Sequence, residues 1–188
     1  MAAIQITEDE YLHSSVMQKV RNRLFWLVAL LLGGMVTSFV IQNQSALIQT
    51  VVSLSFFIPA LIDTGGNVGS QSTTIMVRGI ALNEVDSRNI FTIALKESLV
   101  GSFLGGLLGL VGFFRVVILR EPAIIGIIVG LAIWVVVFVS NLIGIVLPLF
   151  LKKLKFDPAL SATPLITTIV DVIGVFLYFQ IARLFLKF

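Results

Sequence analysis

Cysteine is absent from the 188 residues, histidine occurs once, and charged residues make up only 12% of the chain. Without cysteine, disulfides and thiolate metal sites are excluded. The single histidine, His13, lies in a polar stretch and is expected to be solvated, which argues against Zn²⁺ and Cu sites. So little charge excludes a soluble domain of this length, because its surface-to-volume ratio demands a polar exterior.

Apolar residues are abundant instead, at 57% of the chain, and the mean hydropathy is +1.06. Lipid is the solvent that suits such a composition. The net charge of +3 does not indicate a nucleic-acid partner, because basic residues of membrane proteins more often mark cytoplasmic loops. The polar first 18 residues do not resemble a cleavable signal peptide. We expect a short cytoplasmic leader over residues 1–20 and one transmembrane domain over residues 21–188.

Five apolar stretches are candidates for membrane spans, each of which requires about 20 apolar residues. They cover residues 24–41, 46–77, 90–119, 123–151 and 164–186. The sequence therefore predicts an all-α integral membrane protein with five transmembrane helices.

Basic residues predict the orientation. If the N-terminus is cytoplasmic, nine of the 13 lysines and arginines fall on the cytoplasmic side, as the positive-inside rule requires. These nine are Lys19, Arg21, Arg23, Arg78, Arg88, Lys96, Lys152, Lys153 and Lys155. The other four are Arg115, Arg120, Arg183 and Lys187.

The third stretch carries glycines at helical spacing, namely Gly101, Gly105, Gly109 and Gly112. Small residues at this spacing let two helix backbones approach closely within a membrane. We interpret them as helix-packing positions without chemistry.

The second stretch contains a proline, several glycines and a run of oxygen-bearing side chains between Asp63 and Ser72. Proline and glycine favour unwound backbone, and broken helices in transporters often use freed carbonyls to hold ions. We therefore expect an interruption at this point, and a polar kink at the membrane surface is the alternative. Counting about 1.5 Å per residue from Ala46 places Asp63 near the inner boundary.

Asp171 is a lone acid within the otherwise apolar fifth stretch, seven residues after Pro164. An aspartate in mid-membrane costs at least ~2.5–3.5 kcal/mol, so such residues usually face a cavity and mark an ion route. Polar or small residues share its helix face: Thr163, Thr167, Gly174 and Tyr178. Since the other spans carry no deep basic partner, a cation is favoured over a structural bond to the first or third span.

The available ligands indicate which cations fit. Oxygen ligands without histidine or cysteine favour Mg²⁺, Ca²⁺ or Mn²⁺. A site with one carboxylate, hydroxyls and carbonyls suits Mg²⁺, which keeps much of its water. These arguments leave Ca²⁺, Mn²⁺ and Na⁺ open.

The sequence also leaves two alternatives of other classes open. Asp63-Thr64-Gly65 spells the aspartic-protease triplet, and Asp171 would supply the second acid of an intramembrane protease. The Gly-x-Gly-Asp pattern of membrane-embedded aspartyl proteases is absent. We therefore expect no enzyme. The other alternative is a membrane scaffold that transports nothing.

Two motifs resemble those of the MgtE family of magnesium transporters. The first is PALIDTGGNVGSQS at 59–72 followed by VRG at 77–79, and the second is DPAL at 157–160 followed by PLITTIVD at 164–171. The resemblance extends over residues 20–188. It implies a homodimer with a pore along the subunit interface, lined by the second and fifth helices.

The resemblance also implies the site. Asp171 matches the main Mg²⁺-binding acid, which holds a hydrated ion with the Thr167 carbonyl one turn earlier, while positions on the second helix line the pore. The expected metal-site residues are Asp171, Thr167, Thr163, Asp63, Gly65, Gly66, Asn67 and Ser70.

The function implied is passive Mg²⁺ transport across a bacterial or archaeal plasma membrane, driven by the membrane potential. Exchange of a divalent cation against Na⁺ or H⁺ is the alternative. Longer members carry cytoplasmic regulatory domains before the first span, whereas about 20 residues precede it here. Gating is therefore expected to be intrinsic or supplied by a separate regulatory protein.

Overall fold

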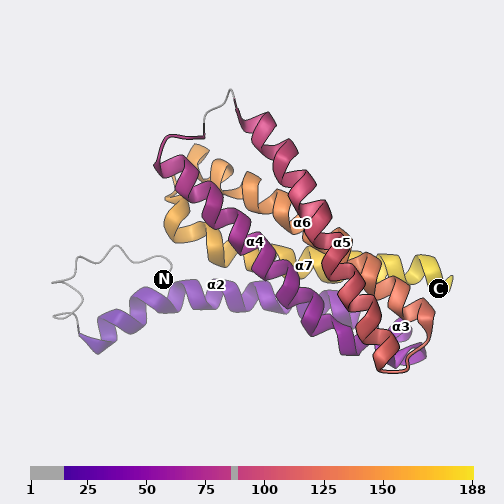
Figure 1. Cartoon of the computed structure of the whole chain (residues 1–188). Helices are drawn as coiled ribbons and strands as arrows, with labels where there is room; N and C mark the ends of the chain where they lie inside the picture. The colour runs from indigo at the N-terminus through magenta and orange to yellow at the C-terminus, as the bar shows by residue number, and fades with distance from the viewer. Residues whose placement is uncertain (1–14, 86–88) are drawn as a thin grey trace.

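The computed structural model describes residues 15–85 and 89–188, except for the side chains of Asn22, Leu160 and Ser161. His13, most of the leader and Arg88 lie outside the described residues. All regular structure in the described part is helical (Figure 1). The elements are α2 (Val16–Gln42), α3 (Ser45–Thr50), the 3₁₀ helix η1 (Val52–Phe57), α4 (Ile58–Ala81), α5 (Ile90–Ile118), α6 (Ala123–Lys153) and α7 (Pro158–Leu186).

Four of these helices, α2, α5, α6 and α7, are long and apolar enough to cross a membrane. The prediction of a helical membrane protein is thereby confirmed. At 24 residues, α4 is about 36 Å long, which also suffices for a span, but its composition is more polar. It is the most amphipathic of the long helices in the described part of the chain.

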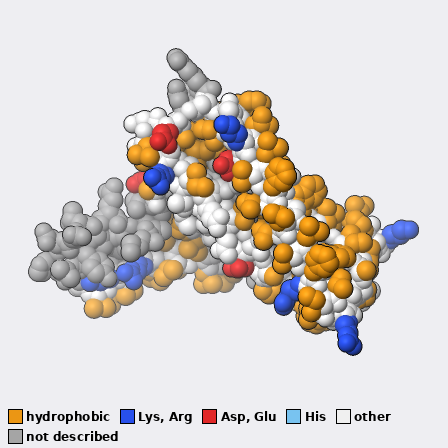
Figure 2. All heavy atoms as spheres, in the orientation of Figure 1, with side chains coloured by type: hydrophobic (Ala, Val, Ile, Leu, Met, Phe, Trp, Pro, Cys, Tyr) orange, Lys and Arg blue, Asp and Glu red, His pale blue; other side chains and the backbone are white. Residues whose placement is uncertain are grey.

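Helix α6 forms the centre of the packing, because α4, α5 and α7 all contact it. Its buried side chains include Val129, Ala132, Val136 and Val137. Helix α2 lies along α7 (Figure 1). Most of its apolar side chains are exposed. Hydrophobic side chains also cover much of the outer surface in Figure 2, as expected for a chain surrounded by lipid.

The glycines of α5 pack against α6, which confirms the interpretation of their spacing. A methyl group added at Gly109 would lie 2.5 Å from the carbonyl oxygen of Gly130, and one at Gly105 would lie 2.8 Å from that of Trp134. Glycine is therefore required for the backbones to approach this closely.

The prediction of an unwound stretch in the second apolar region is wrong. Helix α4 continues through every residue between Asp63 and Ser72, and the irregular backbone lies earlier, in α3 and η1. Pro59 falls in the first turn, where a missing N–H costs nothing. Gly69 is buried where a methyl group would lie 2.9 Å from the Ile166 side chain, so close packing offsets its poor helix propensity.

The depth inferred for Asp63 is also wrong. Because α4 begins at Ile58, Asp63 lies in its second turn, about 27 Å from the end at Ala81. It is therefore near the connection from α2, and far from the connection to α5.

Polar side chains join α4 to α6 within the apolar interior. The hydroxyl of Ser72 donates to the side-chain oxygen of Asn141, and the Asn141 amide donates to the carbonyl of Glu97 on α5. The hydroxyl of Thr73 donates to the Gly144 carbonyl at 3.2 Å. Pro148 lacks the N–H that would normally bond this carbonyl, so the threonine satisfies it.

Candidate metal site between α4 and α7

Asp171 lies near the middle of α7. The helix begins at Pro158, six residues earlier than predicted, and the Asp157 side chain caps it by accepting a hydrogen bond from the Ala159 amide at 2.9 Å. It continues through Pro164. Thirteen residues of rise place Asp171 about 20 Å from the start, deep within any membrane that α7 crosses.

The backbone of α4 faces this carboxylate at Gly66. A methyl group added at Gly66 would lie 3.7 Å from Cγ2 of Thr167 and 4.0 Å from Oδ1 of Asp171. Gly66 thus brings the two helices together without placing a side chain over the acid. The structure therefore places three of the predicted site residues side by side.

The Asp171 side chain is partly buried and has no hydrogen-bond or ion-pair partner within residues 15–85 and 89–188. Over the same residues, no group of three or more His, Cys, Asp and Glu side chains comes together. A cation here would therefore meet one carboxylate per chain, with water completing its shell. Mg²⁺ commonly binds in this way.

Thr167 and Thr163 lie one and two turns before Asp171. The Thr167 hydroxyl donates to the Pro164 carbonyl at 3.0 Å, which leaves oxygen lone pairs for a cation or its water. Thr163 is exposed. The remaining members of the predicted stripe lie inside the fold: Gly174 packs near Val136, and the Tyr178 hydroxyl donates to the Leu54 carbonyl at 2.8 Å.

A polar face runs along α4 next to Gly66. Its exposed side chains recur at helical spacing, and Ser70 is partly exposed beside them. The exposed members are Asp63, Asn67, Gln71 and Thr74. Gly65 lies elsewhere on the helix, buried against Val136 and Val170. Gln71 and Thr74 were not among the expected site residues, although their spacing from Asn67 would have indicated that they share its face.

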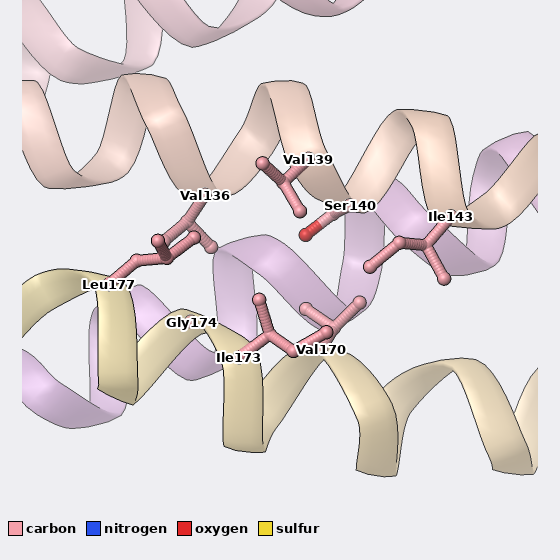
Figure 3. Close-up of a pocket in the computed structure, with 8 residues that line it drawn as sticks. All are labelled: Val136, Val139, Ser140, Ile143, Val170, Ile173, Gly174 and Leu177. Carbon is pink, nitrogen blue, oxygen red and sulfur yellow. The ribbon is translucent and has the colours of Figure 1, made fainter.

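The side of α7 that faces α6 is apolar, unlike the side next to α4. Figure 3 shows Val136, Val139 and Ile143 of α6 opposite Val170, Ile173 and Leu177 of α7, with Ser140 as the polar side chain among them. The gap between these side chains has no room for a water molecule. An ion path along α7 is thus excluded from this gap, in contrast to the polar side next to α4.

These features define a multi-pass helical membrane protein with an unpaired acid beside an amphipathic helix. The sequence model of the MgtE family, described as a divalent cation transporter, matches residues 58–181. The chain belongs to this family, which places it among multi-pass proteins of the bacterial plasma membrane.

Three curated bacterial relatives carry the name magnesium transporter MgtE, which describes a non-enzymatic role. The protein from Thermus thermophilus is 36% identical over 187 residues, or 100% of this chain and 41% of the relative. The Enterococcus faecalis protein is 33% identical, over 95% of this chain and 40% of the relative. The Bacillus subtilis protein is 30% identical, over 88% and 37% respectively. The chain thus spans about two-fifths of the length of these relatives.

Proposed function

We propose that this chain forms a pathway through which Mg²⁺ crosses the membrane down its electrochemical gradient. The observation that carries the proposal is the unpaired Asp171 carboxylate, which lies deep in α7 and opposite the bare backbone of Gly66. A carboxylate at this depth is costly unless it faces water or an ion. Membership of a divalent cation transporter family favours Mg²⁺ as the cargo over a proteolytic role for the same acid.

In this proposal, α4 also crosses the membrane, as the second of five spans, and its polar face lines the path. Its exposed polar side chains would be costly against lipid, and facing water relieves that cost. Asp171, Thr167 and Thr163 form the α7 wall, and Gly66, Asn67 and Ser70 form the α4 wall. Gly65 contributes through close packing, and Asp63 lies at one mouth of the path.

Residues 21–188 act as one pore domain, with the N-terminus in the cytoplasm. Two copies related by a two-fold axis close the path, since the polar face of α4 is open in a single chain. The axis brings two Asp171 carboxylates to one ion, which doubles the negative field. Light scattering of the purified chain should give twice the monomer mass, and a strictly monomeric, transport-competent chain would contradict this arrangement.

Transport in proteoliposomes tests the proposal. A K⁺-diffusion potential, imposed without a Na⁺ or pH gradient, is expected to drive Mg²⁺ uptake by the wild-type chain. An absolute requirement for a Na⁺ or pH gradient would instead indicate that the chain exchanges a divalent cation against Na⁺ or H⁺. If the chain moves none of Mg²⁺, Ca²⁺ and Mn²⁺ under any gradient, the alternative of a non-transporting membrane scaffold would be favoured. If Gly66 and Asp171 form the path, Gly66→Leu and Asp171→Asn should each strongly reduce uptake, whereas changes on the lipid-facing side of α5 should leave it unchanged.

A further inference from the structure

A second concave region lies at the opposite end of α4 from Asp63, where the chain turns into α5. We call it the α4–α5 pocket. It has a volume of about 620 Å³ and is formed by the last turns of α4, the turn that follows, and the first two turns of α5. Among the described residues, its lining combines two basic residues, Arg78 and Lys96, with one acid, Glu84, and several apolar side chains.

The pocket is shaped by a tight reversal of the backbone. Asn83 adopts a left-handed conformation with a φ of 57°, and the amides of Glu84 and Val85 donate to the Gly79 carbonyl at 2.9 and 3.3 Å. The Asn89 side chain donates to the Glu84 carbonyl at 2.7 Å and joins the turn to the start of α5. These bonds hold Glu84, Val85 and Asn89 beside the end of α4.

The side chains around the pocket have the character of a membrane boundary. Arg78 of α4 and Lys96 of α5 are both exposed, so each of the two helices contributes one basic residue to the lining. Ile75 and Leu82 are 62% and 55% exposed and offer apolar surface beside them. In Figure 2, the upper end of the molecule, near the start of α5 in Figure 1, likewise presents basic, acidic and hydrophobic side chains together.

We propose that the α4–α5 pocket binds the phosphate headgroup of an anionic phospholipid of the surrounding bilayer. Arg78 and Lys96 hold the phosphate, and their two positive charges outweigh the one negative charge of Glu84. Ile75, Leu82 and Ile93 contact the glycerol and the first acyl carbons. Basic pockets between transmembrane helices at the cytoplasmic surface recognise lipid headgroups by this chemistry. The positive rim makes the pocket unsuited to Mg²⁺, so this site is separate from the ion path.

Native mass spectrometry of the full chain tests the proposal, with phosphatidylglycerol and phosphatidylcholine supplied at equal concentration in detergent micelles. The wild-type chain is expected to retain phosphatidylglycerol preferentially. Arg78→Gln and Lys96→Gln should each lower this retention about five-fold, the contribution of one basic residue near a membrane surface. Arg78→Lys should recover part of it, because lysine keeps the charge without the planar fork.

Lys152→Gln is the matched control, since Lys152 is exposed in the last turn of α6 and does not line the pocket. It should retain phosphatidylglycerol as the wild type does. Equal losses in all three glutamine variants would overturn the proposal in favour of general surface charge. Unchanged retention in correctly folded Arg78→Gln and Lys96→Gln, judged by circular dichroism, would also overturn it. Displacement of the lipid by an equal concentration of inorganic phosphate would instead assign the pocket to a free anion.

Discussion

Gly109 between α5 and α6 and Gly66 between α4 and α7 serve opposite purposes. Between α5 and α6, Gly109 and Gly130 let the backbones touch, so that an added methyl group would meet a carbonyl oxygen at 2.5 Å. Between α4 and α7, a methyl group at Gly66 would meet nothing closer than 3.7 Å. Gly109 thus provides close packing, as Gly65 and Gly69 do on α4, whereas Gly66 leaves room over Thr167 and Asp171. Substitutions at the closely packed Gly109 should therefore affect stability, and large substitutions at the open Gly66 should affect transport.

The largest effect on transport is expected when this room is filled. Gly66→Leu would extend a side chain over Thr167 and Asp171. We predict a loss of Mg²⁺ uptake of at least about ten-fold, equivalent to about 1.4 kcal/mol, in a protein that still folds. Gly66→Ala is the size control and should transport nearly as the wild type does, because a contact of 3.7 Å is ordinary. Full uptake by Gly66→Leu in proteoliposomes would place the path elsewhere.

The complementary change lies in the packed pair. Gly109→Ala forces a methyl group against the backbone of Gly130, and overpacking of this kind typically costs about 1–3 kcal/mol. We predict a fall in the apparent Tm of roughly 5 °C in thermal unfolding of the detergent-solubilised chain. Gly106→Ala, on the same helix, is the control, because an added methyl group has no neighbour within 4 Å. Equal Tm values for the two variants would contradict the packing role of Gly109.

Substitution of two asparagines should likewise separate stability from transport. Asn141 is 2% exposed and joins α4 to α5 through its side-chain bonds, whereas Asn67 is exposed on the polar face of α4. Asn141→Leu is expected to destabilise the fold by about 1 kcal/mol, a typical value for hydrogen bonds between membrane helices. Asn67→Leu should leave the Tm unchanged and reduce Mg²⁺ uptake. A lower Tm for Asn67→Leu together with reduced Mg²⁺ uptake but an unchanged Tm for Asn141→Leu would contradict these roles.

The smallest effect is expected at Asp63, an exposed acid at the end of the path near the connection from α2. Its field should concentrate cations at the mouth without setting which cation binds. Asp63→Asn is predicted to lower single-channel conductance by less than about two-fold at low salt, and to have no effect near 1 M salt, where screening acts over about 3 Å. A conductance loss that persists at 1 M salt would show that Asp63 contacts the ion directly.

The sequence predicted the parts of this structure that depend on local periodicity. The apolar stretches indicated α5, α6 and α7 to within six residues of their ends, and the glycine spacing of α5 indicated its packing. The lone acid of an apolar stretch pointed to Asp171, which the structure places opposite Gly66, and its role in binding Mg²⁺ stays a prediction. These features are readable because each lies within one helix.

Features that depend on contacts between helices were mistaken or missed. The glycines of α4 suggested an interruption, because their intrinsic preference favours unwound backbone, but packing against α6 and α7 keeps the helix continuous. The depth of Asp63 was wrong because the count from Ala46 assumed one continuous helix, whereas α3 and η1 precede the start of α4 at Ile58. Asn141 was overlooked, although an isolated amide in the most apolar helix would have indicated a buried polar contact.

Calorimetric titration of the solubilised chain with Mg²⁺ tests the assignment of Asp171 most directly. The wild-type chain is expected to bind Mg²⁺, and Asp171→Asn should lose most of this affinity, because the amide keeps the shape of the side chain and removes its charge. Circular dichroism and size-exclusion elution should remain unchanged in the variant. Wild-type Mg²⁺ affinity in a correctly folded Asp171→Asn chain would contradict the account.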